Sequence, residues 1–414
     1  MAAPSGRGNN LDSVRQHNLS TVLSIVHRQG PASRSALTAA TGLNRSTIGA
    51  LVGELAELGL VRESDPGASN RVGRPSPVVA PDSRVVALAV NPEIDAVTVG
   101  VVGLDGVVQH QVRHATDGPV GADEAAHITA DVIRELGDRL DQRHPPVAIG
   151  VAMPGQVRAA DGLVRLAPHL GWVDEPFAEM LGALTGLRVA AANDASLGAN
   201  AERLFGAGRG VQDLVYLNGG ASGIGGGVIV GGRPLKGSAG YAGEWGHTLV
   251  NSAGIRCHCG AVGCLETEVS QSALLRVLGL DAADPDERDR VLAASTSSAV
   301  LAEVERQLGF LAVAVRNATN VFNPQLVVLG GFLGALTAAA PGRLEELVRA
   351  QALKASGESL QIARAELGSA LLMVGAAELA FGPLLANPAA VGGVFATAPG
   401  ARSSAPDLPP ESAF

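Results

Sequence analysis

The hydrophobic pattern of this chain changes its period near residue 84, and this change limits the folds that the sequence can adopt. Between Ile48 and Leu58, apolar residues recur every three or four positions, which predicts an amphipathic helix. Beyond residue 84, short β-branched runs such as 85–90 and 97–102 alternate with helical stretches, which indicates an α/β domain. Since 414 residues exceed one ordinary domain, we expect a small helical domain followed by a larger α/β domain.

The individual elements follow from the same patterns. In the N-terminal part we expect helices at 10–29, 33–41 and 44–58 and strands at 60–63 and 78–80. In the larger part we expect strands at 85–90, 97–102, 107–113, 147–151, 214–217, 227–230 and 326–329, and helices near 122–143, 174–185, 194–206 and 300–321. The stretches 85–113 and 213–236 share a strand–turn–strand design, which indicates two similarly built lobes. The ends, 1–9 and 386–414, are polar or rich in Pro, Ala, Gly and Ser, so we expect both to be disordered.

Charge is distributed unevenly along the chain. Residues 1–84 hold nine Arg, no Lys and six acidic residues, a net charge of +3, whereas the whole chain carries −9. A basic N-terminal domain on an acidic body fits a small DNA-binding domain carried by a soluble effector domain. Aromatic residues make up only 3% of the chain, which argues against a stacking platform for single-stranded nucleic acid. The sequence shows neither a signal-peptide core nor an uninterrupted apolar run of about 18 residues, so we expect a cytoplasmic protein without a membrane span.

The segment Ser33–Ile48 has the layout of a helix-turn-helix. Gly42 lies where the chain must turn sharply between two helices, and Asn44 is placed to cap the second of them. That helix opens with small polar residues and an arginine, which suit contacts with base edges and phosphates. The predicted DNA contacts in this segment are Arg34, Ser35, Asn44, Arg45, Ser46 and Thr47. A three-helix packing module that contacts protein is the alternative interpretation.

A basic turn follows between the two strands predicted for the N-terminal part. Arg71, Gly73 and Arg74 stand there before a proline, and a basic turn stiffened by proline can reach into a narrow minor groove. Taken alone, this Gly-Arg-Pro run also fits an ordinary turn. Together with the helix-turn-helix, it predicts a winged helix-turn-helix DNA-binding domain over residues 10–84.

All three cysteines of the chain, Cys257, Cys259 and Cys264, lie within eight residues of one another. An odd number of closely spaced cysteines does not make a disulfide framework and indicates a metal site. Three thiolates need a fourth ligand for a closed tetrahedral zinc site, and His247 and His258 are both candidates. Four protein ligands leave no open position, so we expect a structural rather than a catalytic Zn²⁺. Three unrelated buried thiols are the alternative.

The residues around this cluster resemble a known family. The run Gly243–His247, followed by Cys257-x-Cys259-Gly260-x-x-Gly263-Cys264-Leu265-Glu266, resembles the signature of the ROK family of repressors, open reading frames and kinases. The helix-turn-helix and its wing are similar to those of the family's regulator branch. The resemblance implies an actin/hexokinase-like, two-lobed α/β sugar-kinase fold over residues 85–385, with a sugar bound in the cleft. It also implies that His247, not His258, completes the zinc site.

The same resemblance implies which residues contact the sugar. Asn193 and Asp194 match an Asn-Asp pair whose aspartate is the catalytic base in the family's kinases, although the pair could also cap a helix. The other implied sugar contacts are Glu244, His247 and Glu266. Carboxylates and amides suit this role because they bind vicinal hydroxyls by paired hydrogen bonds. Where the kinases place an asparagine after proline, this chain has His169 after Pro168, which leaves the identity of the sugar open.

The first phosphate-binding turn of the family's kinases is altered in this chain. The kinases have an Asp-x-Gly-Gly-Thr-type turn, and the matching residues 90–95 read Val-Asn-Pro-Glu-Ile-Asp here. Pro92 has no N–H to offer a phosphate and Glu93 repels one, whereas the second glycine-rich turn, 218–225, is retained. We therefore predict a protein that is not an enzyme.

These expectations combine into a sugar-responsive transcriptional regulator, expected to be a repressor. Its expected partners are double-stranded operator DNA, a sugar or sugar phosphate effector, and further copies of the chain in a homodimer or homotetramer. The alternatives are a sugar kinase that phosphorylates a hexose with ATP and a protein-interaction scaffold. ATP turnover separates the first alternative from a regulator, and DNA binding separates the second.

Overall fold

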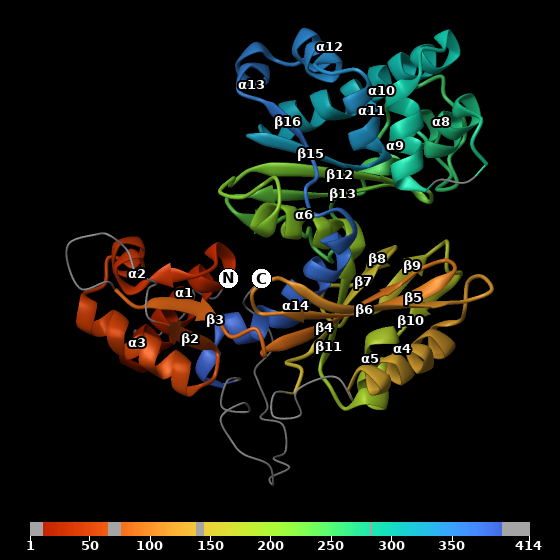
Figure 1. Ribbon diagram of the computed structural model, residues 1–414. Helices are drawn as coiled ribbons and strands as arrows, with labels where there is room; N and C mark the ends of the chain where they lie inside the picture. The colour runs from red at the N-terminus through yellow and green to blue at the C-terminus, as the bar shows by residue number, and fades with distance from the viewer. Residues whose placement is uncertain (1–10, 65–75, 138–144, 282–283, 391–414) are drawn as a thin grey trace, which may run out of the picture.

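The computed structural model describes residues 11–64, 76–137, 145–281 and 284–390. Figure 1 shows three bodies: a small N-terminal domain in red, the first lobe of a larger domain beside it, and a second lobe above the first. Strands and helices alternate along the larger domain. The expected α/β class and the two-lobed sugar-kinase-like architecture are confirmed.

The N-terminal domain consists of three helices and a small antiparallel sheet. Its elements are α1 (Leu11–Gln29), β1 (Ala32–Ser33), α2 (Arg34–Thr41), α3 (Arg45–Glu57), β2 (Val61–Ser64) and β3 (Val78–Pro81). Ser33 caps α2 by accepting the N–H of Ala36, and Asn44 caps α3 by accepting the N–H of Thr47. Gly42, between the helices, has a positive φ of 70°. Short polar caps satisfy first-turn N–H groups, so the sequence itself determines where both helices begin.

Two five-stranded sheets of the same design form the cores of the two lobes. In sheet order, the first contains β11 (Val189–Asn193), β7 (Ile149–Met153), β4 (Val86–Pro92), β5 (Ala96–Gly103) and β6 (Val108–Ala115). The second contains β16 (Gln361–Arg364), β15 (Leu326–Gly331), β12 (Leu214–Gly220), β13 (Gly223–Val230) and β14 (Arg233–Pro234). In each sheet the central strand pairs antiparallel with the next strand along the chain and parallel with a later one. The two similarly built lobes expected from the sequence are therefore present.

Helices cover the faces of these sheets and bury their apolar strands. In the first lobe the covering elements are α4 (Ala122–Gly137) and α5 (Phe177–Thr185), with a small sheet of β8 (Gln156–Val157), β9 (Val164–Ala167) and β10 (Trp172–Glu175). In the second they are η1 (Trp245–His247), α7 (Leu265–Glu268), α8 (Gln271–Leu278), α9 (Pro285–Ala294), α10 (Ser298–Phe322), α11 (Phe332–Ala339), α12 (Arg343–Gln351) and α13 (Lys354–Glu358). Every residue of β5 is buried, as expected for a strand covered on both faces.

Two helices, α6 (Asp194–Phe205) and α14 (Leu371–Ala386), pack against each other where the lobes meet (Figure 1). A Cβ added to Gly375 of α14 would lie 2.8 Å from the carbonyl oxygen of Leu197 in α6. A Cβ added to Gly150 of β7 would lie 1.8 Å from the carbonyl oxygen of Ala376. Glycine is needed at both positions because the backbones approach too closely for a side chain.

The last helix also has the length and composition of a membrane span. Residues Gly368–Ala386, which include the short η2 (Gly368–Ala370), are the one such stretch within the described parts of the chain. In this window 61% is buried inside the protein, against α6 and the first sheet. A helix that is apolar all round and buried by neighbours is a core helix, so its composition is explained without a membrane.

Three expectations from the sequence need correction or lie outside the described residues. The helix expected at 174–185 begins only at Phe177, because Trp172–Glu175 pair with β9 as a strand. The indole of Trp172 donates to the carbonyl of Val120 at 2.9 Å and packs on Phe177, and this tertiary burial outweighs the local pattern. The helix expected to reach residue 143 is described only to Gly137. Of the ends expected to be disordered, 1–9 and 391–414 lie outside the described residues. Residues 386–390 of the expected tail are ordered instead, since Ala386 ends the buried helix α14 and 388–390 are helical.

Candidate DNA-binding and sugar-binding sites

The first turn of α3 presents the predicted DNA contacts to solvent. Asn44, Arg45 and Ser46 are exposed, whereas Thr47 is half-buried. The Oδ1 atom of Asn44 accepts from the Ser46 hydroxyl at 2.7 Å and from the Thr47 N–H at 2.8 Å, so this oxygen is already used to begin the helix. Behind this turn, Ile48, Leu51, Val52 and Leu55 of the apolar stripe are buried. The arrangement leaves an arginine and small polar groups on the outward end of a helix, which suits contacts in a major groove.

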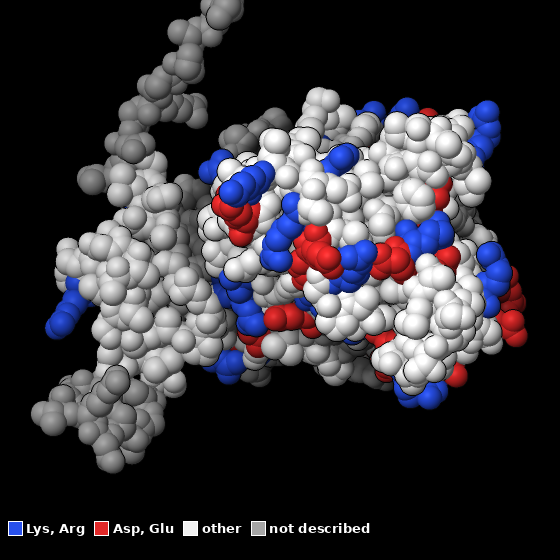
Figure 2. All heavy atoms as spheres, turned by 90° about the horizontal axis from the view of Figure 1, so that it is seen from above, with Lys and Arg blue, Asp and Glu red and all other residues white. Residues whose placement is uncertain are grey.

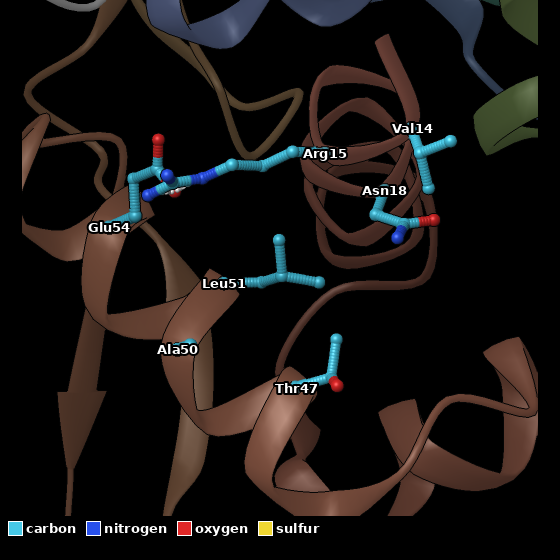
Figure 3. A pocket seen from close by; sticks show the side chains of 7 residues that line it. All are labelled: Val14, Arg15, Asn18, Thr47, Ala50, Leu51 and Glu54. Atoms are coloured by element: carbon cyan, nitrogen blue, oxygen red, sulfur yellow. Dashed lines mark hydrogen bonds and ion pairs between the residues drawn. The ribbon is translucent and has the colours of Figure 1, made fainter. Parts of the chain in front are cut away.

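A groove between α1 and α3 lies beside this turn, as Figure 3 shows. Its lining residues are Val14, Arg15, Asn18, Thr47, Ala50, Leu51 and Glu54. The guanidinium of Arg15 donates to the Glu54 carboxylate at 2.9 Å and links the two helices across it. Thr47 faces this groove, which explains why it is the least exposed of the α3 candidates.

The other predicted DNA contacts differ in their surroundings. Arg34 donates from Nε and Nη2 to both carboxylate oxygens of Glu63 in β2, at 2.6 and 2.5 Å, and this pairing raises the pKa of Arg34 further. A phosphate contact by Arg34 would compete with Glu63. Ser35 is exposed at the start of α2. The wing residues Arg71, Gly73 and Arg74 belong to the 65–75 segment, outside the described residues, although Ser64 and Val78 pair on either side of it.

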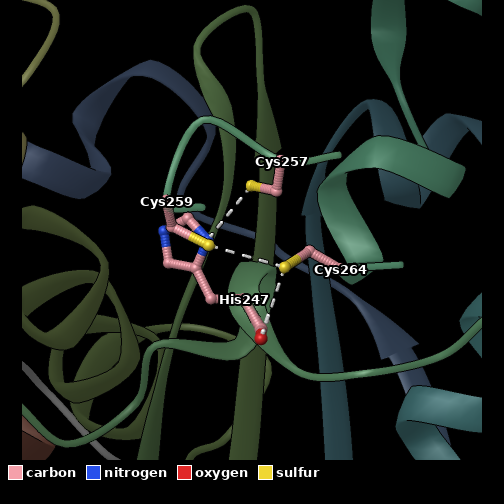
Figure 4. A group of neighbouring side chains, drawn as sticks. All are labelled: His247, Cys257, Cys259 and Cys264. Carbon is pink, nitrogen blue, oxygen red and sulfur yellow. Dashed lines mark hydrogen bonds between the residues drawn. The ribbon is translucent and has the colours of Figure 1, made fainter. Parts of the chain in front are cut away.

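The second lobe brings together the three cysteines and His247 (Figure 4). Their ligand atoms all lie within 4.8 Å of one another. The Cys257 Sγ lies 3.6 Å from the His247 Nδ1, and the Sγ atoms of Cys259 and Cys264 lie 3.7 Å apart. With Zn–S and Zn–N distances of about 2.3 and 2.0–2.1 Å, a tetrahedral site requires separations of roughly 3.8 and 3.6 Å. These two separations fit a tetrahedral site, and the four side chains together could hold a metal ion.

A second set of potential ligands overlaps the first. His258 Nδ1 lies 3.1 Å from the Glu266 Oε1, and His247, Cys257, His258 and Glu266 also place their ligand atoms within 4.8 Å. The set that contains all three thiols, however, includes His247 and not His258. Burial raises the pKa of the Cys257 thiol, so a metal must displace a proton to bind there.

Glu266 connects this cluster to the candidate sugar site. Its carboxylate accepts from the Cys257 thiol at 3.0 Å and lies 3.4 Å from the His247 Nδ1. A Cβ added to Gly223, at the start of β13, would lie 2.5 Å from the Glu266 Oε2, so glycine there leaves room for the carboxylate. The metal cluster and the implied sugar contacts Glu266 and His247 are thus parts of one constellation.

Asn193 and Asp194 lie where β11 of the first lobe passes into α6. Asn193 caps α6 by accepting the N–H of Ser196 at 2.9 Å, and its amide donates to the carbonyl of Gly155 at 3.0 Å. The cap that the sequence left as an alternative is therefore present. Burial, with a smaller contribution from the nearby charge of Glu244, raises the pKa of Asp194 to about 6, against the lowering effect of the Ala195 N–H.

The candidate sugar residues come from both lobes. Asp194 belongs to the first lobe and α6, and the exposed Glu244 stands just before η1 in the second. Two further imidazoles lie nearby: His258, the other candidate for the fourth metal ligand, and His169, which stands where the family's kinases have an asparagine. The ring centroid of His258 lies 5.2 Å from that of His247 and 6.4 Å from that of His169. His169 follows β9 of the first lobe, so this ring contact reaches from one lobe to the other.

The altered phosphate turn lies between β4 and β5. Pro92 ends β4, and the Glu93 carboxylate accepts from the Thr98 hydroxyl at 2.6 Å and from the Arg113 guanidinium at 3.3 Å. An anionic carboxylate therefore occupies a turn that would need backbone N–H donors to bind phosphate.

Two similar α/β lobes, an N-terminal helix–turn–helix segment and a cysteine-rich cluster beside the interlobe residues define a sugar-kinase-like class of protein. The chain belongs to the ROK family, whose sequence profile matches residues 89–382.

Relatives of two kinds share this fold. The xylose repressor of Caldicellulosiruptor bescii is 28% identical over 409 residues, which cover 91% of this chain and 98% of that protein. The glucokinase of Thermotoga maritima is 32% identical over 251 residues, which cover 56% of this chain and 78% of the enzyme. Among solved structures, a ROK family transcriptional regulator that is a homolog of the E. coli MLC protein is 25% identical, covers 92% of this chain and 98% of its own, and has a TM-score of 0.74.

Proposed function

We propose that this protein is a sugar-responsive transcriptional repressor that binds operator DNA through a winged helix-turn-helix and a sugar between the lobes of its ROK domain. The observation that carries this proposal is that likeness to repressors and regulators extends over nearly the whole chain, the N-terminal domain included. The glucokinase match covers only 56% of the chain. The exposed polar turn of α3 supports the same function, because it offers Arg45 and its neighbours to a groove.

The DNA contacts in this proposal come from two places. The first turn of α3 contributes Asn44, Arg45, Ser46 and Thr47, with Ser35 and Arg34 beside it, and the wing contributes Arg71, Gly73 and Arg74. The net positive charge of residues 1–84, on a chain that is acidic as a whole, supports the N-terminal domain as the part that binds DNA. Figure 2 shows that basic and acidic side chains are interspersed over the upper face of the second lobe, which is not the pattern of a phosphate-binding surface.

The metal is Zn²⁺ in this proposal, held by His247, Cys257, Cys259 and Cys264 as a closed tetrahedral site. Three thiolates and one imidazole are a donor set that zinc prefers, and the separations of the side chains fit it. When bound, the ion links η1 to the loop before α7. Its role is structural, because it fixes the segments that carry Glu244 and Glu266.

The sugar lies among Asn193, Asp194, Glu244, His247 and Glu266 in this proposal. The carboxylates accept from its hydroxyls, and the Asn193 amide, fixed by its bond to Gly155, keeps the pair oriented. His169 and His258 stand at the same place and offer further hydrogen-bonding groups. As a cytoplasmic regulator, the protein acts as a homodimer or homotetramer, and a dimer reads an inverted repeat with half-sites roughly 34–36 Å apart.

Sugar phosphorylation is the competing activity, and one observation disfavours it. The first phosphate turn contains Pro92, which lacks an N–H, and the Glu93 carboxylate, which would repel phosphate. We therefore expect no ATP consumption with D-xylose, D-glucose or N-acetylglucosamine in a coupled assay. ATP consumption that depends on one of these sugars and disappears in Asp194→Asn would overturn the assignment as a regulator.

The proposed function is tested by operator binding with and without sugar. Duplexes selected from a random library by the purified protein supply the operator, and a thermal-shift screen supplies the sugar. We expect the sugar to change operator affinity, and we expect Glu244→Ala and Glu266→Ala to remove that response while sugar-free DNA binding persists. Selection that enriches no sequence, or operator binding that every sugar leaves unchanged, contradicts the proposal.

A further inference from the structure

His27, in the N-terminal domain, is buried against the ROK domain. Its side chain is 0% exposed, and that of its partner Glu378 in α14 is 5% exposed. The Nδ1 atom lies 2.5 Å from the carbonyl oxygen of Leu104 in the β5–β6 turn, and the Nε2 atom lies 2.8 Å from the Glu378 Oε1. Both ring nitrogens therefore face oxygen acceptors. A neutral imidazole has one N–H, so only the imidazolium can donate to both.

The surroundings of His27 favour this charged form. Burial alone would lower the pKa of His27, but the charge and hydrogen bond of Glu378, together with the Leu104 carbonyl, raise it above its ordinary value. Arg28, the neighbouring cation on α1, opposes this effect only weakly. Two aromatic rings also lie beside the imidazole: the ring centroid of Phe205 lies 5.5 Å from that of His27, and that of Phe381 lies 6.0 Å away.

These contacts connect His27 to the candidate sugar site through α6. Phe205 is the last residue of α6, and Asp194 is the first. A helix of 12 residues spans about 18 Å and moves as a rigid rod, so a shift at its sugar-binding end reaches the ring that touches His27. Helix α6 is also fixed to the segment before α14, because the buried Glu202 accepts from the N–H groups of Glu366 and Leu367.

We propose that His27 is a positioning residue: it couples the orientation of the N-terminal DNA-binding domain to the closure of the sugar cleft, through α6 and α14. The inference rests on the proposed sugar-responsive function and names the contact that carries its regulation. A second bond between the same elements, from the Ser20 hydroxyl to the Leu385 carbonyl at 2.7 Å, keeps α1 along the end of α14. A buried charge pair tolerates little change in geometry, so it favours one arrangement of the two domains.

Glu378→Gln removes the negative charge of the Glu378 side chain while keeping its size, so it tests the ion pair with His27 separately from the packing. The glutamine amide can donate to the Nε2 of a neutral His27, while the Nδ1–H still donates to Leu104, so both hydrogen bonds persist without the ion pair. Asp82→Asn is the matched control. Asp82 is 1% exposed at the same domain junction, but its carboxylate pairs with Arg62 and Arg84 rather than with α14.

The measured quantity is the ratio of operator affinities without and with the sugar found among D-xylose, D-glucose and N-acetylglucosamine. For the full-length wild type we expect a ratio between about 5 and 150. In Glu378→Gln we expect this ratio to fall toward 1, with sugar affinity and sugar-free operator affinity close to those of the wild type. Asp82→Asn should keep the wild-type ratio.

A pH series distinguishes a coupling role from a merely structural one. Because the pKa of His27 is raised above its ordinary value, His27 keeps its charge to a higher pH than a free imidazole does and loses it as the pH rises through the raised pKa. The wild-type ratio should decline over that pH range. In Glu378→Gln the ratio should not vary with pH. Two results would overturn this inference while leaving the proposed function intact. One is a Glu378→Gln variant that keeps the wild-type affinity ratio, and the other is an Asp82→Asn variant whose ratio falls as far as that of Glu378→Gln. A wild type that responds to none of the sugars overturns the proposed function and this inference with it.

Discussion

In the proposed sugar site, Asp194 is a residue at which ligand binding and stability are expected to oppose each other. An ionised carboxylate accepts hydrogen bonds from sugar hydroxyls better than a protonated one does. In the sugar-free protein, however, burial favours the protonated form and raises its pKa to about 6. If Asp194 binds the sugar as proposed, its ionised carboxylate is kept in the folded protein at a cost in folding free energy.

Asp194→Asn should stabilise the sugar-free protein above pH 6 and weaken sugar binding. Since the folded-state pKa is about 6 and the ordinary value is 3.8, the protonated carboxyl contributes stability that is complete below pH 4 and lost as the pH rises through 6. Asparagine mimics the protonated state, so the variant should gain on the order of 2 kcal/mol at pH 8. Thermal unfolding between pH 5 and 8 measures the difference, which should shrink toward pH 5. A wild type that is as stable as the variant at pH 8 would contradict the raised pKa of Asp194.

Cys259→Ser should release the metal and lower sugar affinity at the same time. Removing one of four ligands opens the site, and the segments that carry Glu244 and Glu266 lose the ion that joins them. Elemental analysis of the purified protein should give one zinc per chain for the wild type and much less for the variant.

His247→Ala and His258→Ala provide the matched comparison for this metal site. The first should lose zinc and the second should keep it, because only His247 lies with all three thiols. A wild type purified without zinc, or zinc loss in His258→Ala alone, contradicts the ligand set.

The clustering of the candidate metal ligands could be predicted from the sequence, whereas the environment of His27 could not. Spacing alone places the three cysteines together within residues 257–264 but left both His247 and His258 open as the fourth ligand, and the choice of His247 came from the family resemblance. The partners of His27 lie 77 and 351 residues away, at Leu104 and Glu378. No periodicity in α1 distinguishes a buried histidine of this kind from an ordinary core residue, so its role follows only from tertiary packing.

At the scale of elements, the sequence predicted the helices and strands that have a capping residue or a long apolar stripe. Helix α3 begins after Asn44 and buries Ile48, Leu51, Val52 and Leu55, as its stripe predicted. Strand β10 was mistaken for the start of α5, because its pairing with β9 and the burial of Trp172 depend on residues outside the local pattern. The short β8 and β9 have no alternating pattern long enough to be recognised.

Arg45→Ala should weaken operator binding without changing the fold. If the arginine donates to a base edge, its loss costs on the order of 1–3 kcal/mol and relaxes the base preference at one position of each half-site. Fluorescence anisotropy with the selected duplex and with single-base variants measures both effects. Arg134→Ala, which removes another exposed arginine, on α4, serves as the control and should bind as the wild type does. Equal operator affinities for the wild type, Arg45→Ala and Arg134→Ala would contradict the assignment of α3 to the DNA interface.

At the scale of the whole molecule, the N-terminal domain and the ROK domain share one hydrophobic core. Leu19, Leu23 and Val26 of α1 belong to the same buried cluster as Phe381 and Leu384 of α14. The N-terminal domain is therefore not joined by a free linker, and a change in the angle between the lobes is expected to reorient it. A ligand can shift such an equilibrium only by its different affinities for the two arrangements.

The most direct test of this coupling is made from the sugar side. Linkage requires that operator DNA change sugar affinity by the same factor by which the sugar changes operator affinity, about 5–150-fold for typical couplings. Calorimetric titration of the sugar into the protein, with and without saturating operator duplex, measures that factor. We predict two different dissociation constants whose ratio equals the one obtained from operator titrations. Equal sugar affinities in the presence and absence of operator would mean that the cleft does not control the DNA-binding domain.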